Sequence, residues 1–455
     1  MTENQTLGKL LHDAHSSFKE AALGWRRFKH KDILPLIKNL SSDHIHTIEL
    51  GKSIEDRAIY EIKLGKGKKN VMLWSQMHGD EPTSTMVIFD ILNFLQATDL
   101  DFDEIRNTIL NNLELSFIPM LNPDGVQKFQ RRNAVEIDLN RDALAMSCPE
   151  SRILKAAHNK NKPIFGFNLH DQSKYYNVPF TKNTATHSFL APAYNYAKDI
   201  NDTRKAAMQG IALMHEVLEH LLPEHTGRYN DDFEPRAFGD NIQSWGTSTI
   251  LVEAGGLRGD PEKQEIRRLH FSILLSLLYN IALDKVSDYS VEQYWAIPEN
   301  DRKLNDLIIR DVQYPKLDKV VDISININEV DDDTFSSFHH EGQIEDLGDL
   351  STFFGYSEHD AVGLSYLETK VFPEVLEDIA AINRINPMDL LKKGFGVLRV
   401  KNFQPNKDFE RIPLLLLDAS EEVKTKLKQG NKCAFFLEDT KGIRFAVING
   451  KMTEL

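Results

Sequence analysis

The sequence is poor in cysteine and in long apolar runs. Its 455 residues include only two cysteines, Cys148 and Cys433, which lie far apart in the chain. This pattern excludes a disulfide framework and indicates two unpaired thiols. No segment reaches the roughly 20 apolar residues that a membrane helix needs, and the first 40 residues contain no apolar stretch like that of a secretory signal. We therefore expect a soluble, cytoplasmic protein that does not enter a membrane.

The sequence also lacks an excess of positive charge and the common nucleotide-binding motifs. Its formal net charge of −14 argues against nonspecific binding to nucleic acid. No GxGxxG follows a strand, and there is no Walker loop and no GxSxG elbow, so nucleotide-binding and serine-hydrolase functions lose support. With 41% hydrophobic and 27% charged residues, the composition is that of a globular protein.

The length and the order of the expected elements indicate two domains, because a single core rarely grows beyond about 300 residues. After polar amino-terminal helices, strand and helix patterns alternate up to an apolar helix at about 261–284. This alternation predicts a mixed, largely parallel central sheet flanked by helices over residues 1–290. Residues 300–455 consist of short β-type runs split by polar turns, with one helical stretch near 371–393, and predict a smaller, mainly β domain. That domain could cover the active site, shape specificity or mediate dimerisation.

Three apolar segments end in side chains that commonly bind metals. VMLWSQM precedes His78, with Glu81 three residues further on, IFGFNL precedes His170, and STILV precedes Glu253. If these segments are parallel strands, the side chains emerge at the carboxyl ends of one sheet, where open α/β folds place their active sites. Each motif alone is weak, but two histidines and a carboxylate are a common catalytic zinc set. We predict one Zn²⁺ per chain, bound by His78, Glu81 and His170, with Glu253 unligated beside it.

The neighbours of these ligands add detail. The residue before a proline avoids helical geometry, and proline suits the first helical position, so Pro82 predicts that Glu81 caps the helix of TSTMVIFDILNFL. Gly79 is expected to give the loop the freedom to aim both of its ligands. Asp171, next to His170, either supports the site or is a plain surface acid.

A second polar cluster follows the apolar segment LSFIPML. It contains an NPDG turn at 122–125, RRNA at 131–134 and DLNR at 138–141. NPDG is ordinary turn chemistry. Arg131 and Arg141, however, lie in one short loop segment, and the guanidinium fork suits carboxylates and oxyanions. A solvated basic patch would explain the arginine pair at 131–132 but explains DLNR less well.

In their order and spacing these motifs resemble the M14 family of zinc metallocarboxypeptidases, over roughly residues 40–285. The blocks that carry the resemblance are HxxE, NPDG, RxNAxxxDLNR, NLH and TxLxE. The resemblance implies that His78, Glu81 and His170 bind the zinc ion and that Glu253 is the general base. It also implies that Arg131 polarises the scissile carbonyl group, and that Asn140 and Arg141 bind the terminal carboxylate of the substrate.

The chain departs from the family pattern where substrate binding is concerned. Gly79 and Asp80 stand where well-known digestive members place an arginine, so one accessory carboxylate contact is absent. The mobile tyrosine of many members has no certain counterpart, and Tyr229 is the nearest candidate for this substrate-binding role. The specificity pocket is expected to be lined from residues 238–245, although no single charged residue there indicates a preferred side chain.

Two further stretches are weaker metal candidates. HEVLEH at 215–220 resembles the HExxH zinc helix, but its histidines are five residues apart, which places them on different helix faces. The acidic run at 329–333, followed by His339, His340 and Glu341, lacks the spacing of a calcium loop and predicts a solvated loop.

Together these observations predict a zinc-dependent metallocarboxypeptidase that hydrolyses the carboxy-terminal bond of a peptide with a free carboxylate. Two alternatives remain open: a zinc amidohydrolase that acts on a non-standard amide such as a cell-wall peptide, and a catalytically inactive binding protein of the same fold. Arg141 favours the peptidase, and Glu253 argues against an inactive protein.

Overall fold

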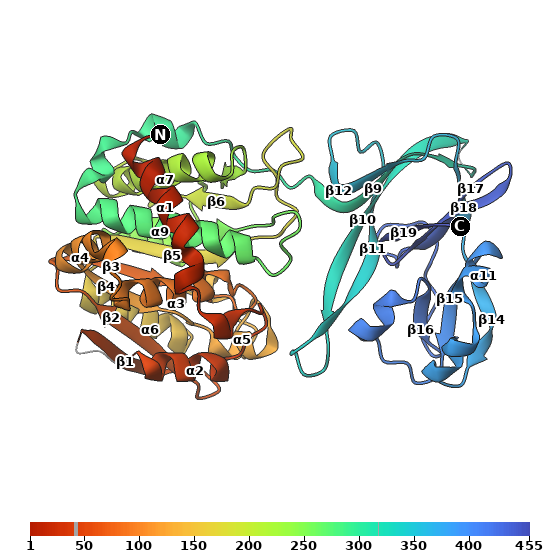
Figure 1. Cartoon of the computed structure of the whole chain (residues 1–455), viewed down its shortest axis with the longest axis horizontal. Coiled ribbons are helices and arrows are strands. Elements are labelled where there is room, and N and C mark those ends of the chain that lie inside the picture. The colour runs from red at the N-terminus through yellow and green to blue at the C-terminus, as the bar shows by residue number, and fades with distance from the viewer. Residues whose placement is uncertain (41–43, 317) are drawn as a thin grey trace. The chain divides into compact units, whose positions relative to one another are not determined.

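The computed structural model describes residues 1–40, 44–316 and 318–455 and divides the chain into two compact units, Met1–Arg302 and Lys303–Leu455 (Figure 1). The first unit runs past residue 290, where the sequence placed its end. Its last residues stay with it because Asp301 and Asn177 exchange backbone hydrogen bonds, at 2.8 and 3.0 Å, and because Tyr294 is fully buried. Among the described residues, no helix combines the length and the apolar character that a membrane span requires.

The first unit is built on an eight-stranded mixed sheet with the order β1-β2-β4-β3-β5-β8-β6-β7. Its four central strands, β4, β3, β5 and β8, run parallel to one another. The strands are β1 (Ile45–Lys52), β2 (Ala58–Leu64), β3 (Lys69–Trp74), β4 (Leu113–Ile118), β5 (Phe165–Asp171), β6 (His187–Leu190), β7 (Thr226–Arg228) and β8 (Ser248–Ala254). The predicted mixed, largely parallel sheet is confirmed.

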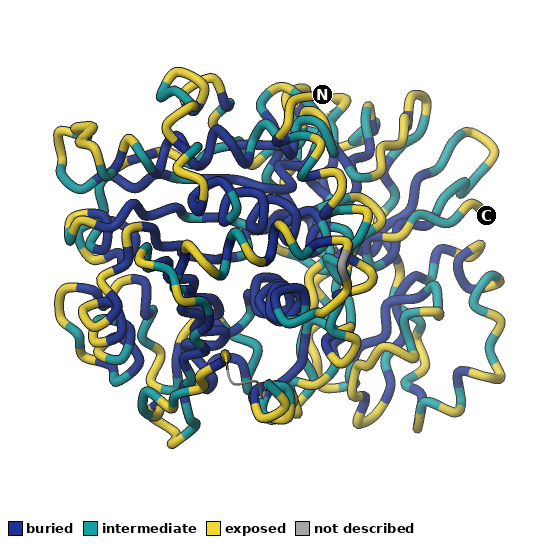
Figure 2. The backbone as a smooth tube through the Cα atoms, turned by 60° about the vertical axis from the view of Figure 1, so that its left-hand side comes forward, coloured by how far each residue is buried: buried dark blue, intermediate teal, exposed yellow. Residues whose placement is uncertain are grey.

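Two apolar cores cover the two faces of this sheet, and alternate residues of β3 contribute to each of them. Val71 and Leu73 belong to the larger core, and Met72 and Trp74 belong to the smaller one. The larger core includes α1 (Glu3–Phe18), α3 (Thr83–Gln96), α4 (Asp103–Asn112), α7 (Asp202–Leu221) and α9 (Gln264–Ala282); the smaller includes α6 (Pro149–Asn161) and α8 (Phe238–Ser244). Figure 2 shows the buried segments of the backbone in dark blue. The helix expected at about 261–284 is α9.

A buried ion network attaches the amino-terminal helix to this core. Arg267 of α9 donates two hydrogen bonds to the carboxylate of Asp90 on α3, at 2.5 and 2.6 Å, and His15 of α1 contacts the same carboxylate at 2.8 Å. All three side chains are almost completely buried. Because an unpaired buried charge is costly, each member depends on the others. Helix α1 is therefore part of the fold of the first unit.

The second unit is mainly β, as predicted. Its larger sheet has the order β11-β10-β9-β13-β17-β18-β19, with β12 on β9, and a smaller parallel sheet has the order β14-β15-β16. The strands are β9 (Leu304–Tyr314), β10 (Lys319–Asp331), β11 (Phe338–Gly348), β12 (Phe354–Asp360), β13 (Ser365–Glu368), β14 (Lys370–Leu376), β15 (Phe395–Val400), β16 (Leu415–Asp418), β17 (Ala434–Asp439), β18 (Gly442–Ile448) and β19 (Lys451–Glu454).

Two local predictions for this unit are only partly right. The stretch near 371–393 begins as strand β14, which pairs with β15, and its helical part consists of the 3-10 helix η5 (Ile379–Arg384) and the α-helix α11 (Pro387–Lys392). Pro373 accounts for the error, since proline disrupts a helix interior. The acidic run at 329–333 is not simply a loop, because its first three residues extend β10 and pair with β11.

Candidate active site

Two of the predicted site residues lie side by side at the carboxyl ends of central strands. His170 on β5 is in register with Glu253 on β8. Strand β3 ends at Trp74, three residues before the end of the apolar segment VMLWSQM. His78 therefore lies in the loop that follows β3. The backbone of that loop is held by Gln76, whose carbonyl accepts a hydrogen bond from the N–H of Asn122 at 2.9 Å. Side chains from strand ends and from a loop thus meet at one edge of the sheet.

The loop before α3 differs in two details from the expectation. Helix α3 begins at Thr83 with Pro82 in the capping position, so Glu81 lies one residue before the cap. Gly79 is needed for space, because a Cβ atom there would lie 2.0 Å from the carbonyl carbon of Gly125. The Asn122 side chain ties the same loops together: it donates to the carbonyl of Met77 at 3.2 Å.

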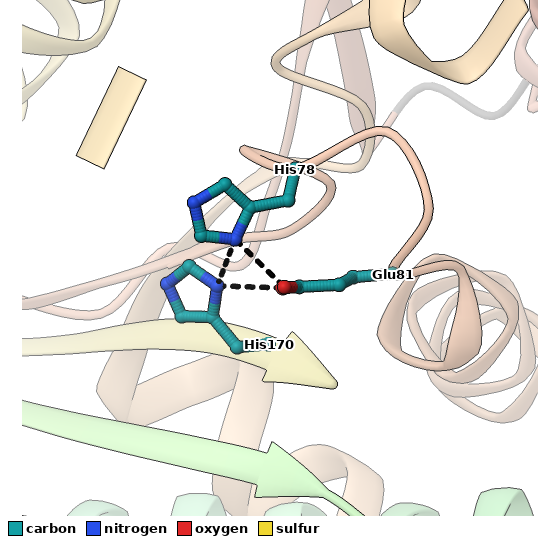
Figure 3. A group of neighbouring side chains, drawn as sticks. All are labelled: His78, Glu81 and His170. Carbon is teal, nitrogen blue, oxygen red and sulfur yellow. Dashed lines mark hydrogen bonds and ion pairs between the residues drawn. The ribbon is translucent and has the colours of Figure 1, made fainter. Parts of the chain in front are cut away.

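The three predicted zinc ligands converge on one another (Figure 3). Nδ1 of His78 lies 2.7 Å from Oε1 of Glu81, Nδ1 of His170 lies 2.7 Å from Oε2, and the two Nδ1 atoms are 3.1 Å apart. Donor atoms around a tetrahedral zinc ion lie roughly 3.4 Å apart, so a small expansion admits the ion. Both histidines and Glu81 are buried, and theirs is the group of three metal-type side chains found among the described residues. The donor set and its geometry fit zinc.

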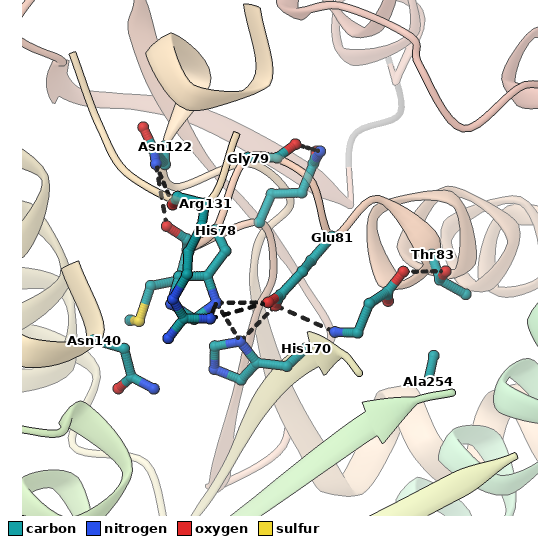
Figure 4. A network of polar contacts seen from close by, with 12 residues as sticks. His78, Gly79, Glu81, Thr83, Asn122, Arg131, Asn140, His170 and Ala254 are labelled. Atoms are coloured by element: carbon teal, nitrogen blue, oxygen red, sulfur yellow. Dashed lines mark hydrogen bonds and ion pairs between the residues drawn. The ribbon is translucent and has the colours of Figure 1, made fainter. Parts of the chain in front are cut away.

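Arg131 and Asp138 border these ligands. Figure 4 shows Arg131 beside His78. Asp138 accepts two hydrogen bonds from the Arg131 guanidinium, at 2.9 and 3.0 Å, and its other oxygen contacts Nε2 of His78 at 3.1 Å. Nη1 of Arg131 also lies 3.1 Å from Nδ1 of His78. A ring nitrogen has one in-plane position for a proton or a metal ion. A metal on Nδ1 would therefore replace this last contact and leave Arg131 attached to Asp138.

The charges of this cluster set the pKa values of its members. Burial opposes the imidazolium form, but the charge of Glu81 and the hydrogen bond with Asp138 outweigh it and raise the pKa of His78 to about 9. Burial lowers the pKa of His170. The pKa of Glu81 falls despite its burial, because both histidines stabilise its charge. Glu81 is thus ionised at neutral pH, and a metal ion must displace a proton from His78.

Glu253 has a buried carboxyl oxygen without a partner at this site. Its Oε2 is buried and has no hydrogen-bond partner among the described residues. Burial, and then the negative charge of Glu81, raise the pKa of Glu253 well above its ordinary value. Buried polar groups are normally paired, and strongly perturbed carboxyl groups gather at functional sites. Both properties are those of a group that exchanges a proton with a substrate or a solvent molecule.

The predicted substrate-binding residues lie on neighbouring turns. Asn140 accepts a hydrogen bond from the backbone of Phe238 at 3.0 Å and so fixes the start of α8. The Arg141 side chain is 38% exposed, donates to the Asn140 carbonyl at 2.7 Å and lies 3.6 Å from Glu234. The hydroxyl of Tyr229 donates to Gln172 at 2.8 Å.

Burial, and then the charge of Glu253, raise the pKa of Tyr229.

Sequence analysis missed four residues that shape the site. Asp138 belongs to the DLNR motif, and the need of a ligating histidine for an acceptor on its second nitrogen could have identified it. Lys263 lies 3.1 Å from Asp171, whose side chain is only 6% exposed, so Asp171 supports the site and is no surface acid. Glu234 and Arg236, paired at 2.9 Å beside Arg141, carry no recognisable sequence signal.

Asp240, on α8, is a buried acid within the stretch expected to line the specificity pocket, and burial raises its pKa to about 7. An unfolded aspartate titrates near 3.8. Between these values the folded state holds a proton that the unfolded state has lost, so the free energy of unfolding decreases as the pH rises from about 4 to about 7. Each pKa unit is worth about 1.4 kcal/mol.

We expect Asp240→Asn to remove about 2–4 kcal/mol of this pH dependence. Urea denaturation at pH 4 and pH 8, followed by tryptophan fluorescence, measures it, because all four tryptophans lie in the first unit. Asp232→Asn is the control, since the Asp232 side chain is 81% exposed. Parallel pH profiles for wild type and Asp240→Asn would contradict the prediction.

Comparison with known proteins agrees with this geometry. Residues 31–249 match the profile of the Peptidase M14 family, zinc carboxypeptidase. Carboxypeptidase D of Homo sapiens is 25% identical over 218 residues, which cover 41% of this chain and 15% of that protein. Carboxypeptidase 2 of Trichophyton rubrum is 30% identical over 104 residues, 23% of this chain and 19% of that protein. The matches thus span less than a fifth of either relative.

Among solved structures, a metallo-carboxypeptidase from Burkholderia cenocepacia is similar with a TM-score of 0.45 and 17% identity, covering 56% of this chain and 68% of that one. The first unit of the chain is thus similar to the M14 zinc carboxypeptidase family over residues 31–249. The predicted resemblance is confirmed.

Proposed function

We propose that this protein is a zinc-dependent carboxypeptidase that removes the carboxy-terminal residue of a peptide. The observation that carries the proposal is the convergence of His78, Glu81 and His170 on one point, with the unpaired carboxyl group of Glu253 in register beside them. When bound, zinc supplies a Lewis acid that activates water and polarises a carbonyl group.

The residues around that point divide the work of hydrolysis. Glu253 takes the proton from the attacking water and returns it to the leaving amine. Arg131, held by Asp138, presents its guanidinium to the oxygen on which negative charge develops. Arg141 binds the terminal carboxylate of the peptide, which decides which bond lies over the site. Asn140 supports this by fixing α8 next to Arg141.

Arg141 separates the proposed peptidase from an amidohydrolase. A charge-assisted hydrogen bond is worth about 1.5–3 kcal/mol. Arg141→Ala should therefore lower kcat/KM about 10- to 100-fold for peptides with a free carboxyl end and less than about threefold for the same peptides amidated. Steady-state assays on matched peptide pairs, with and without a chelator, measure this.

Arg152→Ala is the control for that experiment, because Arg152 is an exposed arginine on α6 that bonds only to the carbonyls of residues 146 and 147 among the described contacts. An equal loss on both kinds of peptide would contradict the exopeptidase assignment and favour an amidohydrolase. Wild-type protein that binds zinc but hydrolyses neither peptide would favour the inactive binding protein.

A further inference from the structure

Lys263 connects the two strands that carry His170 and Glu253. Its ammonium group donates a hydrogen bond to the carbonyl of Ala254 at 2.9 Å and pairs with the carboxylate of Asp171 at 3.1 Å. Asp171 follows His170 on β5, and Ala254 follows Glu253 on β8. We propose that Lys263 is a positioning residue, which fixes the separation between a metal ligand and the candidate general base.

The same ion pair reaches the third segment of the site. The Asp171 carboxylate accepts a hydrogen bond from the hydroxyl of Thr83 at 2.6 Å, at the first residue of α3. The backbone N–H of Asp171 donates to Oε2 of Glu81 at 3.2 Å. One lysine–aspartate pair is thus linked to the strand end of His170, the strand end of Glu253 and the helix start next to Glu81. Figure 4 shows the Thr83 contact and the position of Ala254 at the end of β8.

Burial strengthens the ion pair between Lys263 and Asp171 and raises the energetic cost of removing either side chain. The Lys263 side chain is 13% exposed and that of Asp171 is 6% exposed. Hydrogen bonds between charged groups strengthen where water is excluded, and removal of one partner leaves the other charge without compensation. A variant without the ammonium group would leave the buried Asp171 carboxylate, next to Glu81, without its paired charge.

The backbone holds Lys263 in place on the helix side. Lys263 is the residue before α9 and has a left-handed φ of +52°, which is unfavourable for a side chain of this type. Strained backbone persists where its surroundings determine it, and such residues gather at functional sites. The side chain of Asp260 accepts hydrogen bonds from the first three N–H groups of α9, at 2.7, 2.9 and 3.0 Å. The ammonium group is therefore presented from the fixed start of a long buried helix.

Lys69 offers a matched comparison at the other end of the same helix. Its ammonium group donates to the carbonyl of Ile281 at 3.1 Å and pairs with Asp284 at 2.6 Å. Lys69 lies at the amino end of β3, whereas the site lies beyond the carboxyl ends of the strands. If Lys263 only stabilises the fold, the two lysines should respond alike to the same substitution.

The test compares Lys263→Met with Lys69→Met in the full-length protein, because methionine keeps much of the apolar stem without the charge. Partners of metal ligands typically contribute 10- to 100-fold to metal affinity or activity. We expect Lys263→Met to weaken zinc binding by about that factor, measured by competition with a chelator. We also expect kcat to fall about 10-fold or more while KM stays within about threefold. Lys69→Met should leave zinc affinity and kcat within about twofold of wild type.

Equal zinc affinity and equal kcat in the two variants would overturn the proposal. If Lys263→Met does not fold, Thr83→Val decides, since it removes one link to Asp171 and keeps the ion pair. A loss of zinc affinity of threefold or more in Thr83→Val supports the proposal, and an unchanged affinity overturns it. The comparison of kcat rests on the proposed function, but the comparison of zinc affinity does not. A wild-type protein without peptidase activity would therefore refute the function and leave the role of Lys263 open to the same measurement.

Discussion

Glu253→Gln is expected to retain stoichiometric zinc and to lose hydrolysis, with kcat lower by about 10²- to 10⁴-fold. Glutamine keeps the size of the side chain and one carbonyl oxygen, but it cannot take a proton from water. The zinc ligands are on other segments. Glu253 is in register with His170, and its buried Oε2 has no hydrogen-bond partner among the described residues. Steady-state kinetics on a free-carboxyl peptide and metal analysis of the purified protein measure the two quantities.

Glu219→Gln serves as the control, because Glu219 lies on α7 with a side chain that is 36% exposed. This variant should match wild type within about twofold. A loss smaller than about threefold in Glu253→Gln would remove Glu253 from the role of base. Loss of zinc together with activity would instead assign it a structural role at the metal.

Arg131→Ala should lower kcat by about 10²- to 10³-fold, again with zinc retained. The reason is geometric: two hydrogen bonds to Asp138 hold the guanidinium, while Nη1 points toward His78 and Glu81, at 3.1 and 3.5 Å. A fixed cation at the place where an oxyanion develops contributes more in the transition state than in the ground state. The effect should therefore appear in kcat more than in KM.

The neighbouring arginine provides a control in the same loop. Arg132 donates a hydrogen bond to the carbonyl of Glu136 at 2.7 Å. Among the described residues it makes no hydrogen bond to the predicted zinc ligands. Arg132→Ala should retain nearly full activity. If Arg131→Ala and Arg132→Ala behave alike, the role proposed for Arg131 is wrong. A rise in KM without a fall in kcat would indicate that Arg131 binds substrate and does not stabilise the transition state.

The sequence predicted the location of the site well because apolar runs report buried strands. The apolar content of residues 165–171 and 248–254 predicted strands, so His170 and Glu253 could be placed at strand ends. The apolar content of its sequence also predicted helix α9. In the second unit the local sequence was weaker evidence of secondary structure. Residues 370–376 form a strand there because they pair with β15. There a short apolar run had no periodicity that could distinguish a strand from a helix.

The partners of the site residues could not be read from the sequence. Asp138 precedes Asn140 by two residues, yet nothing in the chain order shows that its carboxylate lies between His78 and Arg131. Lys263 is 92 residues from Asp171 in the sequence, and their contact exists only because α9 begins beside the ends of two strands. Such contacts depend on long-range packing, which leaves no local pattern.

By itself the sequence determined the chemical types of the site, namely two imidazoles, a ligating carboxylate, a second acid and two arginines in a fixed order. It did so because strand periodicity and residue chemistry are local properties. The tertiary structure alone decided which nitrogen of each histidine faces Glu81, that Glu253 keeps an unpartnered carboxyl oxygen, and which ion pair links the strands. Those features follow from distances and burial, and burial changes the energy of a charged group by amounts that depend on every neighbour.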